Sequence, residues 1–276
     1  MRLKVRHTTV YTYAEPFAYL IQAIRLTPRP HDGLAIHRWQ VTGTDGRALP
    51  ATADGFGNVV LTQTITRETD TVEISVEGDV ETRDTFGVVR GAPEPLPPLA
   101  FTQPTNATQT DAAIADLADW AAAGRANDLD RLHRLMRAIG ERIARAPDSA
   151  DAQPTAAAAL TAGRGVPADH SHVMIAAAQH LGYPARYVSG YLWTSDDDVA
   201  PANHAWTEVH VADLGWVGFD PANGLCPTEA YVRVATGRCY DDAAPVRGIR
   251  RGGASERLSV AVQIAAGIQA QQQQQQ

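Results

Sequence analysis

Apolar and polar residues alternate along most of the first 90 positions. The odd-numbered residues from Leu3 to Tyr13 form one face, and a second alternating run occupies residues 71–80. A period of two is typical of β-strands that are buried on one face. Residues 54–58 combine aspartate, glycine and asparagine, which favour turns. Short strands separated by turns predict a β-rich, sandwich-like N-terminal domain over residues 1–90.

The pattern changes to a helical period after a proline-dense segment. Residues 91–98 contain four prolines, which exclude a helix interior or a central strand, so we interpret 91–110 as an interdomain linker. Beyond the linker, apolar residues recur every three or four positions, which predicts helices at 111–122 and after the capping residue Asn127. A third helix is expected from about Pro167 to His180.

Strand patterns return in the second half of the chain. We expect strands at 186–193, 205–211, 216–219 and 258–264. Helices packed on an antiparallel sheet define an α+β core, which we place at residues 111–268. The chain ends in six consecutive glutamines, and the tail at 269–276 is expected to be disordered.

Composition and charge narrow the class of protein. The chain has 276 residues, a net charge of -7 and no basic stripe, so nucleic acid is not expected as a partner. No run of about 18 apolar residues is present, and the N-terminus lacks the apolar centre of a signal peptide. We therefore expect a cytoplasmic protein with no membrane partner. Cys226 and Cys239 are too few for a disulfide framework or a zinc site, and no cofactor or metal is implied.

Two polar residues lie at the predicted strand ends of the core. His204 precedes the strand at 205–211, and Asp220 follows the strand at 216–219. A thiol at a helix start, with a histidine and an aspartate on neighbouring strands, is the arrangement of a cysteine hydrolase. In that arrangement the histidine takes the thiol proton and the aspartate orients the ring. A structural histidine and a turn-forming aspartate are the alternative.

The spacing of this pair depends on the hairpin that joins the two strands. If the loop is 213–215, with Gly215 in a left-handed turn position, Asp220 faces Glu208. His204 then lies on the same face but four residues away, or about 13 Å along the strand. A bulge beyond Phe219 would have to close this gap. A two-residue loop would place His204 and Asp220 on opposite faces.

Several segments resemble the bacterial transglutaminase-like family, whose members combine a β-rich N-terminal region with a papain-like α+β core. The resemblance extends from the first strand to about Ile264, and it implies a site in which His204 shuttles a proton and Asp220 orients His204. The segments that carry it are 25–29 and 54–58 in the N-terminal region, 181–191 in the core, 203–206 around the histidine and 216–224 around the aspartate.

The family's nucleophile is a cysteine in a Gly-Val-Cys-x-Asp turn at the start of a helix. Residues 165–169 read Gly-Val-Pro-Ala-Asp here, so Pro167 occupies the position of the cysteine. In a first interpretation the protein is a natural relic, since proline is favoured at the first helical position. In a second, the cysteine of an active parent was replaced deliberately or by a sequence error. In a third, Ser171 or Cys226 is the nucleophile, although a shift of one helical turn, about 5 Å, should defeat the geometry of His204.

With a cysteine at position 167, the resemblance implies acyl transfer on a glutamine side-chain amide or a peptide bond of a protein or peptide substrate. With Pro167 in place we expect an inactive protein, and the alternative is a non-catalytic peptide- or protein-binding module. The remaining polar and aromatic candidates have structural interpretations as well. We expect Asp169 to cap the helix, Trp206 and Trp216 to pack in the core, and Asn203 and Asn223 either to form turns or to hydrogen-bond the His204 and Asp220 pair.

Overall fold

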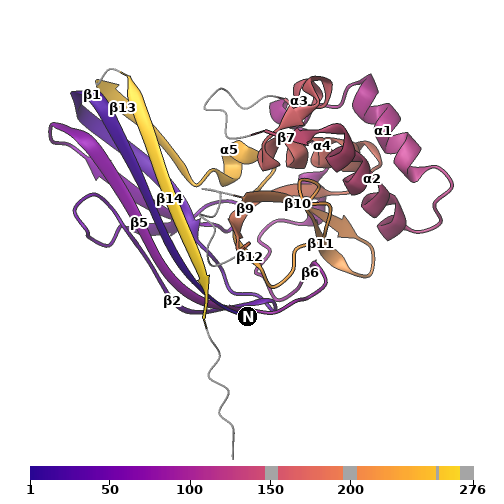
Figure 1. Ribbon diagram of the computed structural model, residues 1–276, viewed down its shortest axis with the longest axis horizontal. Helices are drawn as coiled ribbons and strands as arrows, with labels where there is room; N and C mark the ends of the chain where they lie inside the picture. The colour runs from indigo at the N-terminus through magenta and orange to yellow at the C-terminus, as the bar shows by residue number, and fades with distance from the viewer. Residues whose placement is uncertain (147–154, 195–203, 253–254, 268–276) are drawn as a thin grey trace, which may run out of the picture.

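The structure consists of two antiparallel sheets and a layer of helices (Figure 1). It is a computed structural model that describes residues 1–146, 155–194, 204–252 and 255–267. In Figure 1 the first sheet stands on one side of the molecule, and the helices cover the second sheet on the other side. The α+β class predicted from the sequence is confirmed. The glutamine tail, for which disorder was expected, lies outside the described residues.

The first sheet curls around one long strand, β1 (Arg2–Thr27). Its first half pairs with β5 and β14, and its second half pairs with β4 and β13. Buried and exposed residues alternate along most of β1, as the period of two predicts for a strand with one buried face. The other strands of this sheet are β2 (Leu34–Thr42), β3 (Ala51–Ala53), β4 (Val59–Ile65), β5 (Thr69–Thr82), β13 (Val246–Gly252) and β14 (Glu256–Ala266).

The second sheet has the strand order β12-β9-β10-β11-β6. The helix α4 (Pro167–His180) packs on this sheet, and the Thr207 hydroxyl in β10 (His204–Val211) donates a hydrogen bond of 3.1 Å to the Ser171 carbonyl in α4. The strands are β6 (Val88–Val89), β9 (Ala185–Leu192), β10 (His204–Val211), β11 (Gly215–Phe219) and β12 (Tyr231–Gly237), and β7 (Ala144–Arg145) and β8 (Arg164–Gly165) form a separate parallel pair.

The helices begin where their capping residues predict. The side chains of Asp111 and Asn127 accept the backbone N–H groups of Ile114 and Asp130, which satisfies free donors in the first turns of α1 and α2. The helices are α1 (Ala112–Ala122), α2 (Asp128–Arg142), α3 (Ala156–Ala162), α4 (Pro167–His180) and α5 (Tyr240–Ala243), with 3-10 turns at Pro98–Phe101 and Asn106–Thr108. None of the helices described is long and apolar enough to span a membrane.

The domain boundaries expected from the sequence differ from the pairing of the strands. The final alternating segment was assigned to the core at 111–268, but β13 and β14 both pair with β1 in the first sheet. Conversely, β6 lies within the expected N-terminal domain and pairs with β11 of the core. Alternation identifies a strand but not its partner, because pairing is decided by contacts far apart in the sequence. Each region therefore contributes strands to the sheet of the other, and the two share one hydrophobic core.

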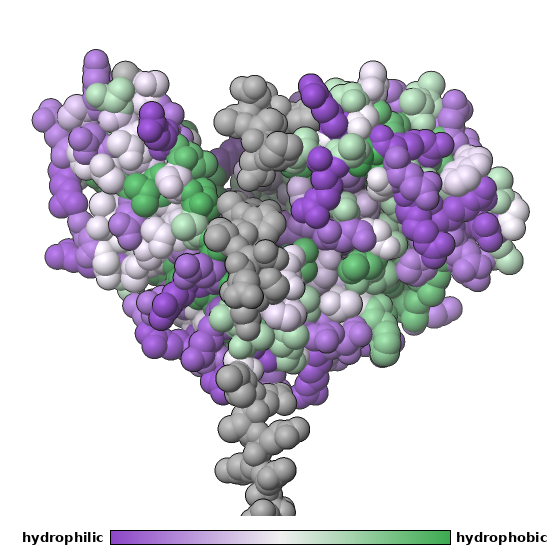
Figure 2. Space-filling view, in the orientation of Figure 1, coloured by the Kyte–Doolittle hydropathy of each residue, from purple (hydrophilic) through white to green (hydrophobic). Residues whose placement is uncertain are grey.

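The segment interpreted as a linker, 91–110, packs against the core. Glu94 forms an ion pair with Arg186 of β9, and the Gln179 side chain at the end of α4 donates to the carbonyl of Phe101 at 2.8 Å. Figure 2 shows a largely hydrophilic outer surface, with hydrophobic side chains gathered where the first sheet faces the middle of the molecule. The two regions are thus packed together rather than connected by a loose tether.

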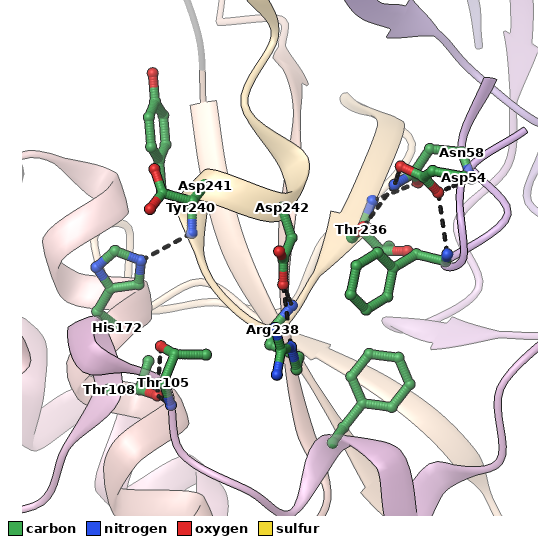
Figure 3. A network of polar contacts seen from close by, with 12 residues as sticks. Asp54, Asn58, Thr105, Thr108, His172, Thr236, Arg238, Tyr240, Asp241 and Asp242 are labelled. Atoms are coloured by element: carbon green, nitrogen blue, oxygen red, sulfur yellow. Dashed lines mark hydrogen bonds and ion pairs between the residues drawn. The ribbon is translucent and has the colours of Figure 1, made fainter. Parts of the chain in front are cut away.

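One asparagine joins the first sheet to the edge of the second (Figure 3). The Asn58 side-chain amide donates to the Thr236 carbonyl at 2.7 Å and accepts the Thr236 N–H at 2.8 Å. Asn58 thereby takes the place of a neighbouring strand beside β12. Asp54 holds Asn58 by accepting from its side-chain amide and its backbone N–H, and Arg25 donates to Asp54 at 2.9 Å. The turn at 54–58 therefore connects the two regions.

Candidate active site

The register of the β10–β11 hairpin brings His204 and Asp220 close together. Val211 pairs with Gly215 and Thr207 with Phe219, so the loop is 212–214, which is neither of the two loops considered from the sequence. Continued past Phe219, this register places Asp220 opposite Trp206, only two residues from His204 and on the same face. The separation of four residues that a loop at 213–215 would give does not occur, and no bulge in β11 is required.

This position of the loop is possible because of the backbone conformation around it. Asp213 and Gly215 both have positive φ angles, of 64° and 84°. The left-handed position expected at Gly215 is confirmed. Aspartate also tolerates this region better than most side chains, so the loop can turn within three residues.

His204 and Asp220 form a buried hydrogen-bonded pair. His204 Nε2 lies 2.6 Å from Asp220 Oδ2. Because the carboxylate can only accept, Nε2 carries the proton, and Nδ1 of the neutral ring has a free lone pair. His204 Nδ1 is buried and has no hydrogen-bond partner among the residues that the structure describes. The ring is therefore held in the tautomer that a general base needs.

Asp220 is held by four further hydrogen bonds. Its Oδ2 accepts from Tyr231 Oη and Asn223 Nδ2, each at 2.7 Å, and its Oδ1 accepts the backbone N–H groups of Ala222 and Asn223. Burial alone would raise the pKa of Asp220, but the hydrogen bonds from His204, Tyr231 and Asn223 hold that pKa below its usual value. Asp220 thus stays ionised in a site with almost no solvent.

Tyr231 belongs to this site, although sequence reasoning did not identify it. Its ring packs against His204 and Trp206, with centroid distances of 5.7 and 5.4 Å. Burial, followed by the charge of Asp220, raises the pKa of Tyr231, which keeps the hydroxyl protonated as a donor. No motif marks Tyr231 in the sequence, because β12 lacks a clear alternation of apolar and polar residues and we did not predict it to be a strand. Asn223, considered as a possible partner of the pair, does contact it, and Asn203 lies outside the described residues.

Pro167 begins α4 at the position expected from the sequence. The preceding residue, Val166, is extended, with φ of -88° and ψ of 168°, which is the conformation that a following proline requires. Asp169 Oδ2 accepts the Val166 N–H at 2.8 Å, so the expected capping role of Asp169 is confirmed. Burial raises the pKa of Asp169. Proline is therefore accommodated at this helix start without disturbing the cap.

The turn before Pro167 is connected to the histidine and aspartate pair through Arg145. Arg145 pairs with Gly165 in the short parallel ladder of β7 and β8. Its guanidinium donates to Asn223 Oδ1 at 3.1 Å, and Asn223 Nδ2 lies 3.3 Å from His204 Nε2. His204 is the first residue of β10, so this contact joins the start of α4 to the end of the sheet where the pair lies.

The other possible nucleophiles are poorly placed for catalysis. The Ser171 hydroxyl is buried and donates to the Pro167 carbonyl at 2.9 Å, within its own helix. Burial raises the pKa of Cys226 to about 11, so its thiol stays protonated near neutral pH. Cys239 is a buried free thiol. No group of three or more metal-ligating side chains is found among the described residues.

Comparisons with known proteins identify the family. Residues 3–81 match the bacterial transglutaminase-like N-terminal region, and residues 115–221 match the transglutaminase-like superfamily. The uncharacterized protein ML0607 of Mycobacterium leprae is 30% identical over 292 residues, covering 95% of this chain and 98% of that protein. The chain belongs to the bacterial transglutaminase-like family. A second relative, Mb2599c of Mycobacterium bovis, is 37% identical over 103 residues, covering 33% of this chain and 32% of that protein.

The transglutaminase-like fold is also seen in a solved structure. A proposed cysteine protease from Cytophaga hutchinsonii superposes with a TM-score of 0.74 at 21% identity, over 95% of this chain and 90% of that one. This similarity extends over both regions of the chain. The transglutaminase-like and cysteine-protease-like fold expected from the sequence is confirmed.

The two tryptophans of the core differ in their surroundings. Trp216 packs edge-to-face on Phe101, and the guanidinium of Arg186 lies 3.8 Å from the centre of its ring. Trp206 packs beside His204 with nearly parallel rings and contacts Tyr231. Both are buried, as predicted, and Trp206 in addition forms a wall of the candidate site.

Proposed function

We propose that this chain retains the acyl-transfer scaffold of the transglutaminase-like family and lacks only its nucleophile, so that it is inactive as it stands. Two observations together carry this proposal: Pro167 lies at the helix start, and His204 is hydrogen-bonded to Asp220. The other ring nitrogen of His204, Nδ1, has no hydrogen-bond partner among the described residues. Proline offers no atom that could attack a carbonyl.

A thiol at position 167 would complete a cysteine-dependent mechanism. His204 Nδ1 would take the thiol proton, and the thiolate would attack the carbonyl carbon of a glutamine side chain or a peptide bond. The proton would then pass from His204 to the departing ammonia or amine, leaving a thioester on the protein. Water or an amine would attack the thioester and release the thiol. Asp220 would stabilise the imidazolium throughout.

The geometry around Pro167 supports a loss of the nucleophile without loss of the fold. Val166 already has the backbone conformation that precedes proline, and the cap from Asp169 is intact. Ser171 and Cys226 offer no replacement, since the Ser171 hydroxyl is bonded within its helix and the Cys226 thiol has a raised pKa. These features favour a natural relic over an active enzyme with a displaced nucleophile.

The first test compares the protein with its Pro167→Cys variant. Each is incubated with a fluorescent amine and a glutamine-containing protein, and in parallel with a peptide substrate whose hydrolysis is monitored. We expect no turnover by the unmodified chain and measurable acyl transfer or hydrolysis by the variant. Pro167→Ser serves as the matched control, because serine is a far weaker nucleophile with this histidine. Turnover by the unmodified chain at the rate of the variant would contradict the proposal.

A binding module on the same scaffold is the second candidate function. It is favoured by the intact hydrogen bonds around Asp220 in a chain without the nucleophile, since catalysis by this chain does not explain the contacts of Tyr231 and Asn223. A folded Pro167→Cys variant without activity would favour this second function. We also propose a cytoplasmic location, which is supported by the free thiols of Cys226 and Cys239.

A further inference from the structure

A cavity of about 40 Å³ lies between the two regions of the molecule, on the face of the second sheet opposite to α4. Its core wall includes Trp206 and Glu208, which alternate along β10 with Thr207, the residue that contacts α4. Its other wall includes His31 and Arg83 of the N-terminal region. Cavities between regions of a chain are common ligand sites. None of the hydrogen bonds of the His204 and Asp220 pair involves this cavity's polar groups, apart from the shared residue Tyr231.

The charged groups of the core wall are already balanced among themselves. Both oxygens of Glu208 accept from guanidinium groups, through Arg186 Nε at 2.7 Å and Arg233 Nε at 2.7 Å and Nη2 at 3.1 Å. The far side of Arg186 is paired with Glu94. Although burial opposes the charge of Glu208, Arg233 and Arg186 outweigh it and lower the pKa of Glu208 to about 2. Both carboxylate oxygens of Glu208 are therefore already paired with arginine side chains.

Hydrogen-bond donors remain around the cavity. Arg233 Nη1 makes no hydrogen bond within the described residues, and the exposed guanidinium of Arg83 forms no ion pair there. His31 Nδ1 accepts the Gly33 N–H at 3.1 Å, so the proton of the neutral ring is on Nε2 and can be donated. Burial and the nearby charge of Arg233 keep that ring neutral by lowering the pKa of His31 to about 4.

We infer that this cavity binds the carboxylate group of a small acid or of a peptide C-terminus. The lining carries the charges of Arg83, Arg233 and Glu208, which leaves one positive charge to match one carboxylate. A doubly charged phosphate would meet Glu208 without a second cation to compensate it. The volume is about three times the ~10–15 Å³ that one water needs, which suits a carboxylate and the carbon that bears it.

This inference does not depend on the nucleophile, so it is tested on the unmodified chain. Amide resonances are followed by NMR during titration with acetylglycine, with a triglycine peptide that has a free C-terminus, and with the amidated form of each. Sodium chloride at matched ionic strength controls for screening. We expect saturable shifts at Gly33, Thr85 and Gly87 with carboxylates and none with the amides. Saturation by acetylglycine alone supports a free acid as the source, and saturation by the peptide supports a C-terminus.

A pair of variants tests the assigned donors. Arg83→Gln removes the uncompensated charge from an exposed position, so the fold should persist, and we expect carboxylate affinity to fall roughly fivefold or more. Arg90→Gln alters an exposed arginine on the same segment outside the lining, and affinity should not change. Equal shifts with carboxylates and amides, no saturable shift at all, or an unchanged affinity in Arg83→Gln would each overturn the inference.

Discussion

At the scale of single residues, the site depends on the protonation of one histidine and on what holds it. Five hydrogen bonds converge on the Asp220 carboxylate, and one of them fixes the tautomer of His204. Such a buried carboxylate is stable only while its donors are present. The contribution of Tyr231 can therefore be measured without any catalytic activity.

Tyr231→Phe removes one donor from Asp220 and leaves the ring in place. We expect the free energy of unfolding to fall by about 1–2 kcal/mol and the pKa of Asp220 to rise towards its usual value, because a buried acceptor loses a partner. Chemical denaturation measures the first effect, and NMR titration of the carboxyl group measures the second. Tyr19→Phe is the control, since the half-exposed Tyr19 hydroxyl has no hydrogen bond within the described part of the chain. A loss equal to that of the control would contradict this role.

At the scale of elements, the sequence predicted local structure better than long-range pairing. Periodicity located α1 and α2, the cap Asn127 marked the start of α2, and α4 begins at Pro167 as expected. The pairing of β14 with β1 was missed, because alternation in a strand does not encode its neighbour.

For the candidate site too, the sequence indicated the residues but not how their strands pair. His204 and Asp220 were found from their positions at strand ends, but their contact follows from a hairpin register that differs by two residues from the one that a loop at 213–215 would give. That register depends on the positive φ angle of Asp213, a conformation that the sequence permits without requiring it. Tyr231 was missed because its strand, β12, had no clear period.

The edge of β12 provides a prediction at this scale. Asn58→Ala leaves the N–H and the carbonyl of Thr236 without partners in a buried position. We expect a loss of about 2–4 kcal/mol in the free energy of unfolding and faster hydrogen exchange at Thr236. Asn106→Ala, at an exposed position in a 3-10 turn, is the matched control. Unchanged exchange at Thr236 in Asn58→Ala would show that Asn58 does not act as a strand partner.

At the scale of the whole molecule, buried neutral histidines link stability to pH. Burial lowers the pKa of His7 and of His172 to about 4. His172 Nε2 accepts the Tyr240 N–H (Figure 3), and the ring of His7 bridges Tyr191 and Thr9, so protonation disturbs contacts between α4, α5 and both sheets. These histidines lie where the regions of the molecule meet.

Acidification should therefore destabilise the protein. Because the unfolded histidines titrate near pH 6.5 and the folded ones near 4, the unfolded state binds more protons within this window, and stability falls as the pH decreases through it. The loss is about 3 kcal/mol at most for each histidine. Urea denaturation at several pH values measures the slope, and His7→Gln should reduce it by about one proton. An identical slope in the variant would refute the contribution of His7.

The central claim is that His204 and Asp220 remain competent as a base and its orienting group and that only the nucleophile is missing. The most direct measurement is the pH dependence of alkylation of the thiol introduced by Pro167→Cys, with the modified site located by mass spectrometry. With His204 intact, reaction should begin well below the ordinary thiol pKa of about 8.5, and the combined variant Pro167→Cys with His204→Asn should shift the profile back towards it. Superimposable profiles for the two variants would contradict the account.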